Sequence, residues 1–226
     1  MNVNIKYYLL YALAYGIVLL LGEVIYKLLK RGPSWSRSFA HLSAGLITLP
    51  FPWLFTSHWW VLALAIQSCL VLLVTRRLKL LPSHHLIAGR SAGSYLFFAS
   101  VYLCFLVSSH TGLTELFVVP MLVLSFSDVA AALVGRRFGK RTIQKRNPTT
   151  NPSKTLAGSA AFFLTALIVL FISYYYYIGW GFAGSISMTI LLALITTSIE
   201  AYSPHGSDNF SIPFTVLIIM HIGFLF

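Results

Sequence analysis

Long apolar runs separated by short polar segments dominate the chain. A helix that crosses a membrane needs about 20 mostly apolar residues, and two of the runs are long enough to need dividing. Pro50 and Pro52 divide the first of these, and Gly179 and Gly181 divide the second, because such residues form turns. The pattern predicts an all-α integral membrane protein, a single domain of residues 1–226 with about eight transmembrane helices. These cover residues 7–26, 38–54, 58–75, 92–109, 113–134, 155–177, 180–200 and 209–226.

The composition supports a membrane protein and excludes the soluble classes. Of the 226 residues, 58% are hydrophobic and only 9% are charged, whereas a soluble domain carries about 25% charged residues. The mean hydropathy is +0.80. Cys69 and Cys104 lie inside apolar runs without the spacing of metal ligands, so they are expected to be small buried residues and not part of a disulfide framework.

The basic residues predict the orientation in the membrane. All of the 16 Lys and Arg residues except Lys6 lie in three segments, at about 27–37, 76–90 and 135–154. Cytoplasmic loops are enriched in Lys and Arg. These loops, with the loop 201–208, are therefore expected in the cytoplasm and both termini on the other side; in a bacterium this is the cytoplasmic membrane. The same rule explains the net charge of +11 without a nucleic-acid partner.

Carboxylates gather at the predicted cytoplasmic ends of the helices. Such groups are costly in or beside a membrane and tend to be functional. Glu23 precedes Lys27 by four residues, so the two can pair along a helix. No basic residue follows Asp128 until Arg136, and a buried carboxylate there needs a cation or strong hydrogen-bond donors.

Three segments on this side contain residues suited to a cation and a phosphate. The first combines Asp128 with the cations Arg136 and Lys140 and with Gly135 and Gly139. These glycines would let the backbone approach a ligand. Alternatively they serve only helix packing, because small residues four apart permit close helix contact.

The second segment predicts a helix N-terminus. Asn151 is expected to cap the helix, Pro152 to occupy its first position and Lys154 to lie in its first turn. The free N–H groups and the positive end of a helix dipole bind phosphate. An ordinary capped helix is the alternative.

The third segment places Glu200, Asp208 and Asn209 around a short loop that contains Pro and Gly. Hard oxygen ligands of this kind suit Mg²⁺ that is held jointly with the phosphates of a substrate. The three segments together predict a site for a cation and phosphate.

These segments resemble the CTP-dependent polyprenol kinases, a family of membrane-embedded enzymes that includes dolichol kinase and phytol kinase and is distantly similar to the phosphatidate cytidylyltransferases. The resemblance covers the chain from about residue 37 onward. Two positions depart from the family pattern, because Ser38 replaces a Lys and Ala157 a Glu. The matching motifs are Asp128-x-x-Ala131-x-x-x-Gly135-x-x-x-Gly139-Lys140, Lys154-Thr155-Leu156-x-Gly158-Ser159, Glu200 with Asp208-Asn209-x-x-Ile212-Pro213, and Arg37-x-x-x-His41-x-x-x-Gly45.

The resemblance implies transfer of the γ-phosphoryl group of CTP, or of another nucleoside triphosphate, to a long-chain isoprenoid alcohol such as phytol or dolichol. It implies Mg²⁺ as the cofactor and the lipid bilayer as the setting. The implied catalytic residues are Asp128, Asp208 and His41, and the implied Mg²⁺ ligands are Asp128, Asp208 and Glu200. The implied nucleotide and phosphate ligands are Lys154, Lys140, Arg136, Gly135, Gly139, Thr155 and Asn209.

Two other functions stay open. A CDP-lipid synthase has a similar Asp-x-x-Ala block but carries a later Pro-Gly-His-Gly-Gly run, which this chain lacks after Asp208. A transporter of an anionic solute would place its site near the membrane midplane, whereas the acidic residues here gather at one face. No Walker motif is present, so a P-loop fold is not expected.

Overall fold

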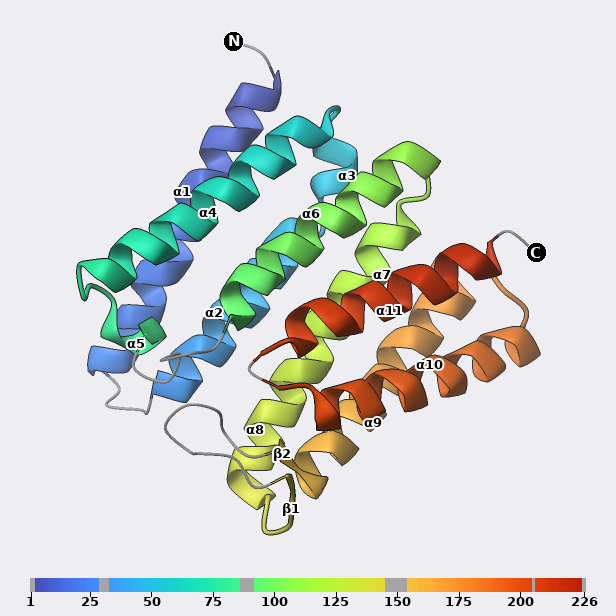
Figure 1. The fold of residues 1–226 in the computed structure, drawn as a ribbon. Coiled ribbons are helices and arrows are strands. Elements are labelled where there is room, and N and C mark those ends of the chain that lie inside the picture. The colour runs from blue at the N-terminus through green and yellow to red at the C-terminus, as the bar shows by residue number, and fades with distance from the viewer. Residues whose placement is uncertain (1–2, 29–32, 86–91, 145–153, 205, 225–226) are drawn as a thin grey trace.

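The structure is a computed structural model that describes residues 3–28, 33–85, 92–144, 154–204 and 206–224 (Figure 1). Almost all of these residues are helical. The elements in chain order are α1 (Val3–Leu28), α2 (Pro33–Thr48), α3 (Phe51–Leu54), α4 (His58–Arg77), α5 (Pro82–His85), α6 (Gly93–Thr111), α7 (Glu115–Val123), the π-helical turn η1 (Leu124–Asp128), α8 (Val129–Phe138), β1 (Thr142–Gln144), β2 (Lys154–Thr155), α9 (Leu156–Ile172), the π-helical turn η2 (Ser173–Tyr177), α10 (Phe182–Tyr202) and α11 (Asp208–Gly223).

The helices confirm the multi-pass α-helical membrane protein predicted from the sequence. Seven of the eight predicted runs each coincide with one helical segment, whereas the run 38–54 covers both α2 and α3. Six are long and apolar enough to cross a membrane, namely Val3–Leu28, His58–Arg77, Gly93–Thr111, Glu115–Phe138, Leu156–Tyr177 and Phe182–Tyr202. The other two, α2 and α11, have 16 residues each. The count of eight spans and their orientation stay predictions.

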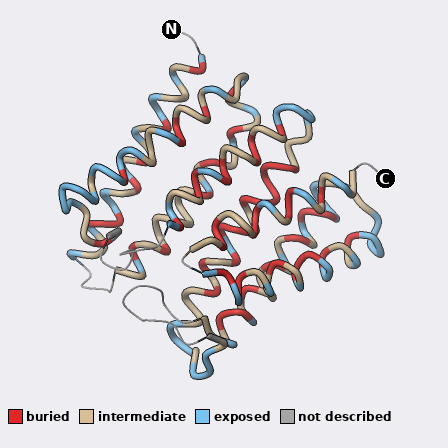
Figure 2. Tube along the Cα trace, viewed as in Figure 1, coloured by how far each residue is buried: buried red, intermediate tan, exposed pale blue. Residues whose placement is uncertain are grey.

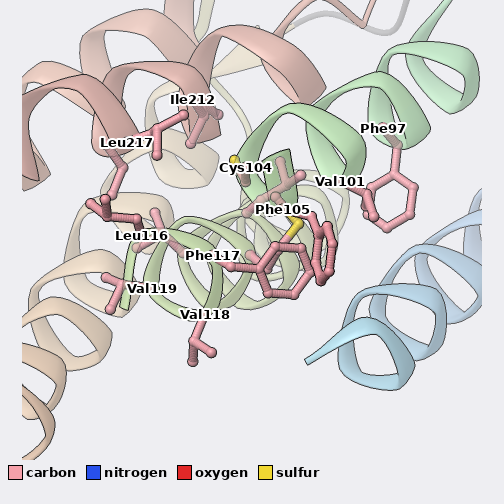
Figure 3. Packing of buried hydrophobic residues seen from close by; sticks show 14 of the residues in the cluster. Phe97, Val101, Cys104, Phe105, Leu116, Phe117, Val118, Val119, Ile212 and Leu217 are labelled. Carbon is pink, nitrogen blue, oxygen red and sulfur yellow. The ribbon is translucent and has the colours of Figure 1, made fainter. Parts of the chain in front are cut away.

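The core lies where α6, α7 and α11 pack together (Figure 3). Phe105 of α6 meets Phe117 of α7 edge to face, with ring centroids 5.9 Å apart. α7 is buried along most of its length, whereas α1 and α4 have an exposed outer face (Figure 2). That face is apolar, with side chains such as Leu13, Leu20 and Leu70, as expected for helices in contact with lipid.

The helix between Glu115 and Phe138 widens into a π-helical turn at Leu124–Asp128. Pro120 lies inside the same helix and has no backbone N–H to donate to the preceding turn. Isolated π-helical turns within α-helices are frequent at functional sites. Asp128 is the last residue of this one.

The basic ends of several helices lie at one end of the bundle. The last turn of each of three helices carries basic residues: Lys27 in α1, Arg76 and Arg77 in α4, and Arg136 and Arg137 in α8. These ends lie near α5 and the small β1–β2 hairpin, while the start of α1 and the end of α11 lie at the other end of the bundle (Figure 1). We refer to the first as the basic end.

Candidate active site

Lys154 joins two buried carboxylates at the basic end. Its Nζ atom donates a hydrogen bond to Oε1 of Glu200 at 2.6 Å and another to Oδ2 of Asp208 at 2.7 Å. Oε2 of Glu200 also accepts a hydrogen bond from Ser159 Oγ at 2.8 Å. Glu200 lies near the end of α10 and Asp208 begins α11, so the lysine joins the two sides of the α10–α11 connection.

The location of Lys154 corrects one prediction. The residue lies in strand β2 and not in the first turn of a helix, because α9 begins at Leu156. Thr155 is the N-cap, and its side chain accepts a hydrogen bond from the N–H of Gly158 at 3.1 Å. The predicted cap, Asn151, and the following Pro152 lie outside the described residues.

The surrounding charges keep Lys154 protonated. Burial alone would lower the pKa of its ammonium group. The carboxylates of Asp208, Asp128 and Glu200 have the larger combined effect and hold this pKa above its ordinary value. Lys154 is therefore a permanent cation among three acidic side chains that come from three different parts of the chain.

Asp128 and His41 form a second pair beside this cluster. Oδ2 of Asp128 lies 3.8 Å from Nε2 of His41, and the aspartate side chain is 23% exposed. The imidazole also hydrogen-bonds the main chain of Leu124, but Nε2 has no hydrogen-bond partner among the described residues. The pair thus combines an accessible carboxylate with an uncommitted ring nitrogen.

Two arginines add positive charge around these acids. Arg37 lies one turn before His41 on α2 and interacts electrostatically with Asp208. Arg136 interacts with Asp128, and its Nη2 atom donates a hydrogen bond to Ser38 Oγ at 3.1 Å. Ser38, which replaces the Lys of the family pattern, therefore accepts a hydrogen bond from Arg136 of another helix.

The predicted glycines lie in a close contact between α8 and the start of α9. A Cβ added to Gly135 would lie 2.9 Å from Oγ1 of Thr155, and one added to Gly158 would lie 2.9 Å from the carbonyl oxygen of Ala131. A Cβ on Gly139 would lie 2.6 Å from the Thr155 side chain. Helix packing, the alternative interpretation of these residues, accounts for their small size. Contact of Gly135, Gly139 or Thr155 with a nucleotide stays a prediction.

The side chains of two predicted ligands make no hydrogen bond or ion pair with the charged cluster in the described part of the chain. The side-chain amide of Asn209 donates to the main-chain carbonyl oxygen of Gly93 at 2.8 Å, and the main-chain carbonyl oxygen of Asn209 accepts from Ser100 Oγ at 2.9 Å. Asn209 therefore ties α11 to α6. Lys140 is exposed between α8 and β1. Their predicted contacts with nucleotide stay predictions.

The three predicted Mg²⁺ ligands are not equally available to a metal. Within the described segments, no group of three or more His, Cys, Asp or Glu side chains is arranged to hold one. Lys154 donates a hydrogen bond to one carboxylate oxygen of Glu200 and to one of Asp208. The second oxygen of Glu200 accepts from Ser159, and the second oxygen of Asp208 accepts from the Asn209 N–H. Mg²⁺ held with substrate phosphates needs only one or two carboxylates. Asp128 fits that role directly, and Asp208 fits once Lys154 binds phosphate instead.

The predicted site did not include Arg37 or Ser159, although both belong to the matching motifs. Arg37 precedes His41 by four residues, which places both on one face of α2. Ser159 lies in the first turn of α9, after the cap. Helical spacing alone places Arg37 and His41 on one face of α2. Glu200, the partner of Ser159, lies 41 residues further along the chain, so this hydrogen bond can be recognised only in the folded structure.

Comparison with known proteins gives the chain a family. Residues 2–206 match the cytidylyltransferase family. The chain is 26% identical over 209 residues to the phytol kinase of Synechocystis sp., and the alignment covers 92% of this chain and 87% of that protein. It is also 34% identical over 94 residues, 41% of each chain, to an uncharacterized protein of Rickettsia prowazekii. No solved structure matches. The matched region contains Asp128, Lys154 and Glu200 and therefore most of the charged cluster. Because the match covers residues 2–206, the chain belongs to the cytidylyltransferase family.

Proposed function

We propose that the protein is a membrane lipid kinase, which transfers the γ-phosphoryl group of CTP to a long-chain isoprenoid alcohol such as phytol. The observation that carries the proposal is the arrangement at the basic end, where Lys154 joins Glu200 and Asp208 beside the pair of His41 and Asp128. The similarity to a phytol kinase over nearly the whole chain supports the same activity.

The cations of the cluster would bind the phosphates of the nucleotide. Phosphoryl transfer depends mainly on positioning and on neutralising the charge of the transferred group. Lys154 is protonated and already lies against carboxylates, so an incoming triphosphate competes with Asp208 and Glu200 for its ammonium group. Arg136 and Arg37 extend the positive charge on the side of α2 and α8. Mg²⁺, when bound at Asp128 and Asp208, would neutralise further charge on the phosphates.

His41 and Asp128 would take up the proton of the acceptor alcohol. The alcohol oxygen forms a bond to the γ-phosphorus, the bond from that phosphorus to the β–γ bridging oxygen breaks, and CDP leaves. The hydroxyl proton passes to the uncommitted Nε2 of His41 or to the neighbouring carboxylate. Either group satisfies the requirement for a base within hydrogen-bond reach of the reacting hydroxyl.

Cytidylyl transfer is the second candidate, and the family match favours it. In that reaction a phosphorylated lipid attacks the α-phosphorus of CTP and pyrophosphate leaves. The leaving group therefore separates the two functions. Purified protein incubated with CTP, Mg²⁺ and phytol is expected to release CDP in amounts equal to the phosphorylated lipid. Pyrophosphate release with phosphatidate as acceptor would replace this proposal with a CDP-lipid synthase.

A further inference from the structure

An apolar cavity of about 120 Å³ lies between α1, α2, α4 and α6. Small residues form part of two of its walls, with Ala12 and Gly16 on α1 and Ala40 and Ala44 on α2. In each pair the residues are four apart, so one small side chain recurs at each helical turn. These small side chains leave space between α1 and α2.

One part of the cavity wall belongs to the proposed active site. Arg37 and His41 line the cavity on α2 and Asn209 lines it on α11. His41 is also the partner of Asp128, at 3.8 Å. A molecule in the cavity can therefore have one end among apolar side chains and the other beside the groups proposed to take up a proton.

Two buried polar atoms of the cavity residues have no hydrogen-bond partner in the part of the chain that the structure describes. Nε2 of His41 and the hydroxyl of Tyr15 are both unsatisfied among the described residues. Buried polar atoms without partners are rare in folded proteins. In the wall of one cavity they indicate a ligand that is mostly apolar but carries a hydrogen-bonding group.

We infer that this cavity binds the hydroxyl-bearing end of the acceptor alcohol, with the hydroxyl group at His41 and the first carbons of the chain among the apolar side chains. The inference rests on the proposed function for the chemistry at the hydroxyl but assigns a separate binding site. The occupant is a single isoprenoid chain. A volume of about 120 Å³ is close to that of a cavity that holds one benzene ring. The cavity therefore takes only the part of this chain next to its hydroxyl group.

Gly16 allows the cavity to be filled without disturbing its walls. A Cβ added to Gly16 meets no atom within 4 Å, so a larger side chain at this position extends into open space. Gly16 lies inside α1, and a leucine there also has a higher helix propensity than glycine. Gly184 offers a matched control, because it is an exposed glycine of α10. A Cβ added to Gly184 would come no closer than 3.7 Å to another atom, which belongs to the Trp180 ring.

The test uses a phytol analogue with a photoreactive diazirine on the carbons nearest its hydroxyl group and the purified full-length protein. Wild type is expected to be labelled on peptides of α1, α4 and α6, with no nucleotide present. Gly16→Leu is expected to reduce this labelling at least tenfold and to raise the KM for phytol, while CTP binding is unchanged. Gly184→Leu is expected to label like wild type, and Ala12→Leu provides a second cavity-filling variant.

The outcomes separate this inference from the proposed function. Labelling that maps to other helices in wild type, or that survives in the folded Gly16→Leu variant, would overturn the cavity assignment even if CTP phosphorylates phytol. Labelling of the cavity in a protein that transfers no phosphoryl group would leave the assignment in place and refute the kinase. The wild-type labelling map decides the question if both filling variants fail to fold.

Discussion

Gly45 of α2 packs directly against Ser125 of the π-helical turn. A Cβ added to Gly45 would lie 1.8 Å from Oγ and 2.8 Å from Cβ of Ser125. Gly45 lies one turn after His41, and Ser125 lies three residues before Asp128. The contact therefore sets how closely His41 approaches the carboxylate of Asp128.

The first prediction concerns this contact. Gly45→Ala is expected to push α2 away from the π-helical turn and to lower turnover at least tenfold, because the approach of His41 to Asp128 is lost. Overpacking of this kind costs about 1–3 kcal/mol of stability, which thermal unfolding of the purified protein would measure. Adding Ser125→Gly removes both clashing atoms and should restore activity. Gly184→Ala, which has room for its methyl group, should behave like wild type, and equal losses in both alanine variants would contradict the account.

Removal of Lys154 is expected to affect both stability and activity. Lys154→Ala leaves the buried carboxylates of Glu200 and Asp208 without their shared cation, and breaking a buried ion pair costs about 3–5 kcal/mol. Adding Glu200→Gln removes one negative charge but keeps an oxygen that can accept from Ser159. The double variant is therefore expected to recover part of the lost stability but none of the CTP-dependent turnover. Full activity in either variant would show that Lys154 has only a structural role.

Asp128 and Asp208 should respond differently to loss of their charge. Asp128→Asn is expected to leave thermal stability close to wild type, because the side chain is partly exposed and lies 3.8 Å from His41, beyond hydrogen-bond distance. Asp208→Asn is expected to lower stability, because it weakens a 2.7 Å ion pair with Lys154. Both should reduce turnover more than tenfold, a change of about 1.4 kcal/mol or more in the activation barrier. Asp128→Asn turnover within tenfold of wild type at saturating Mg²⁺ would exclude Asp128 as a metal ligand.

The orientation in the membrane can be measured directly. In a background with Cys69 and Cys104 replaced, a cysteine at Arg141 should react with a membrane-impermeant reagent only from the cytoplasmic side, and one at Gly179 only from the other. The reason is the bias of basic residues toward cytoplasmic loops. Reaction of both positions from the same side would contradict the predicted spans between them.

The sequence was sufficient for the helices but not for the contacts of the site. Apolar runs and turn residues identify each long helix, because a membrane requires a minimum length and hydropathy. The pairing of Lys154 with Asp208 spans 54 residues and has no local signal. The β1–β2 hairpin was also missed, since its second strand has only two residues and borders a helix cap at Thr155. Gly135 and Gly139 were compatible with two roles, and only their distances to Thr155 and neighbouring backbone show the packing.

The fate of the γ-phosphoryl group tests the central claim most directly. Wild-type protein and Asp128→Asn would each be incubated with phytol, Mg²⁺ and CTP labelled at either the γ- or the α-phosphate, and the label in the extracted lipid would be counted. We predict that γ-label enters the lipid with wild-type protein, that α-label does not, and that Asp128→Asn transfers less than about a tenth of the wild-type γ-label, in line with a barrier higher by about 1.4 kcal/mol or more. Entry of α-label into a lipid product, or equal transfer of γ-label by Asp128→Asn and wild type, would contradict the proposed kinase site.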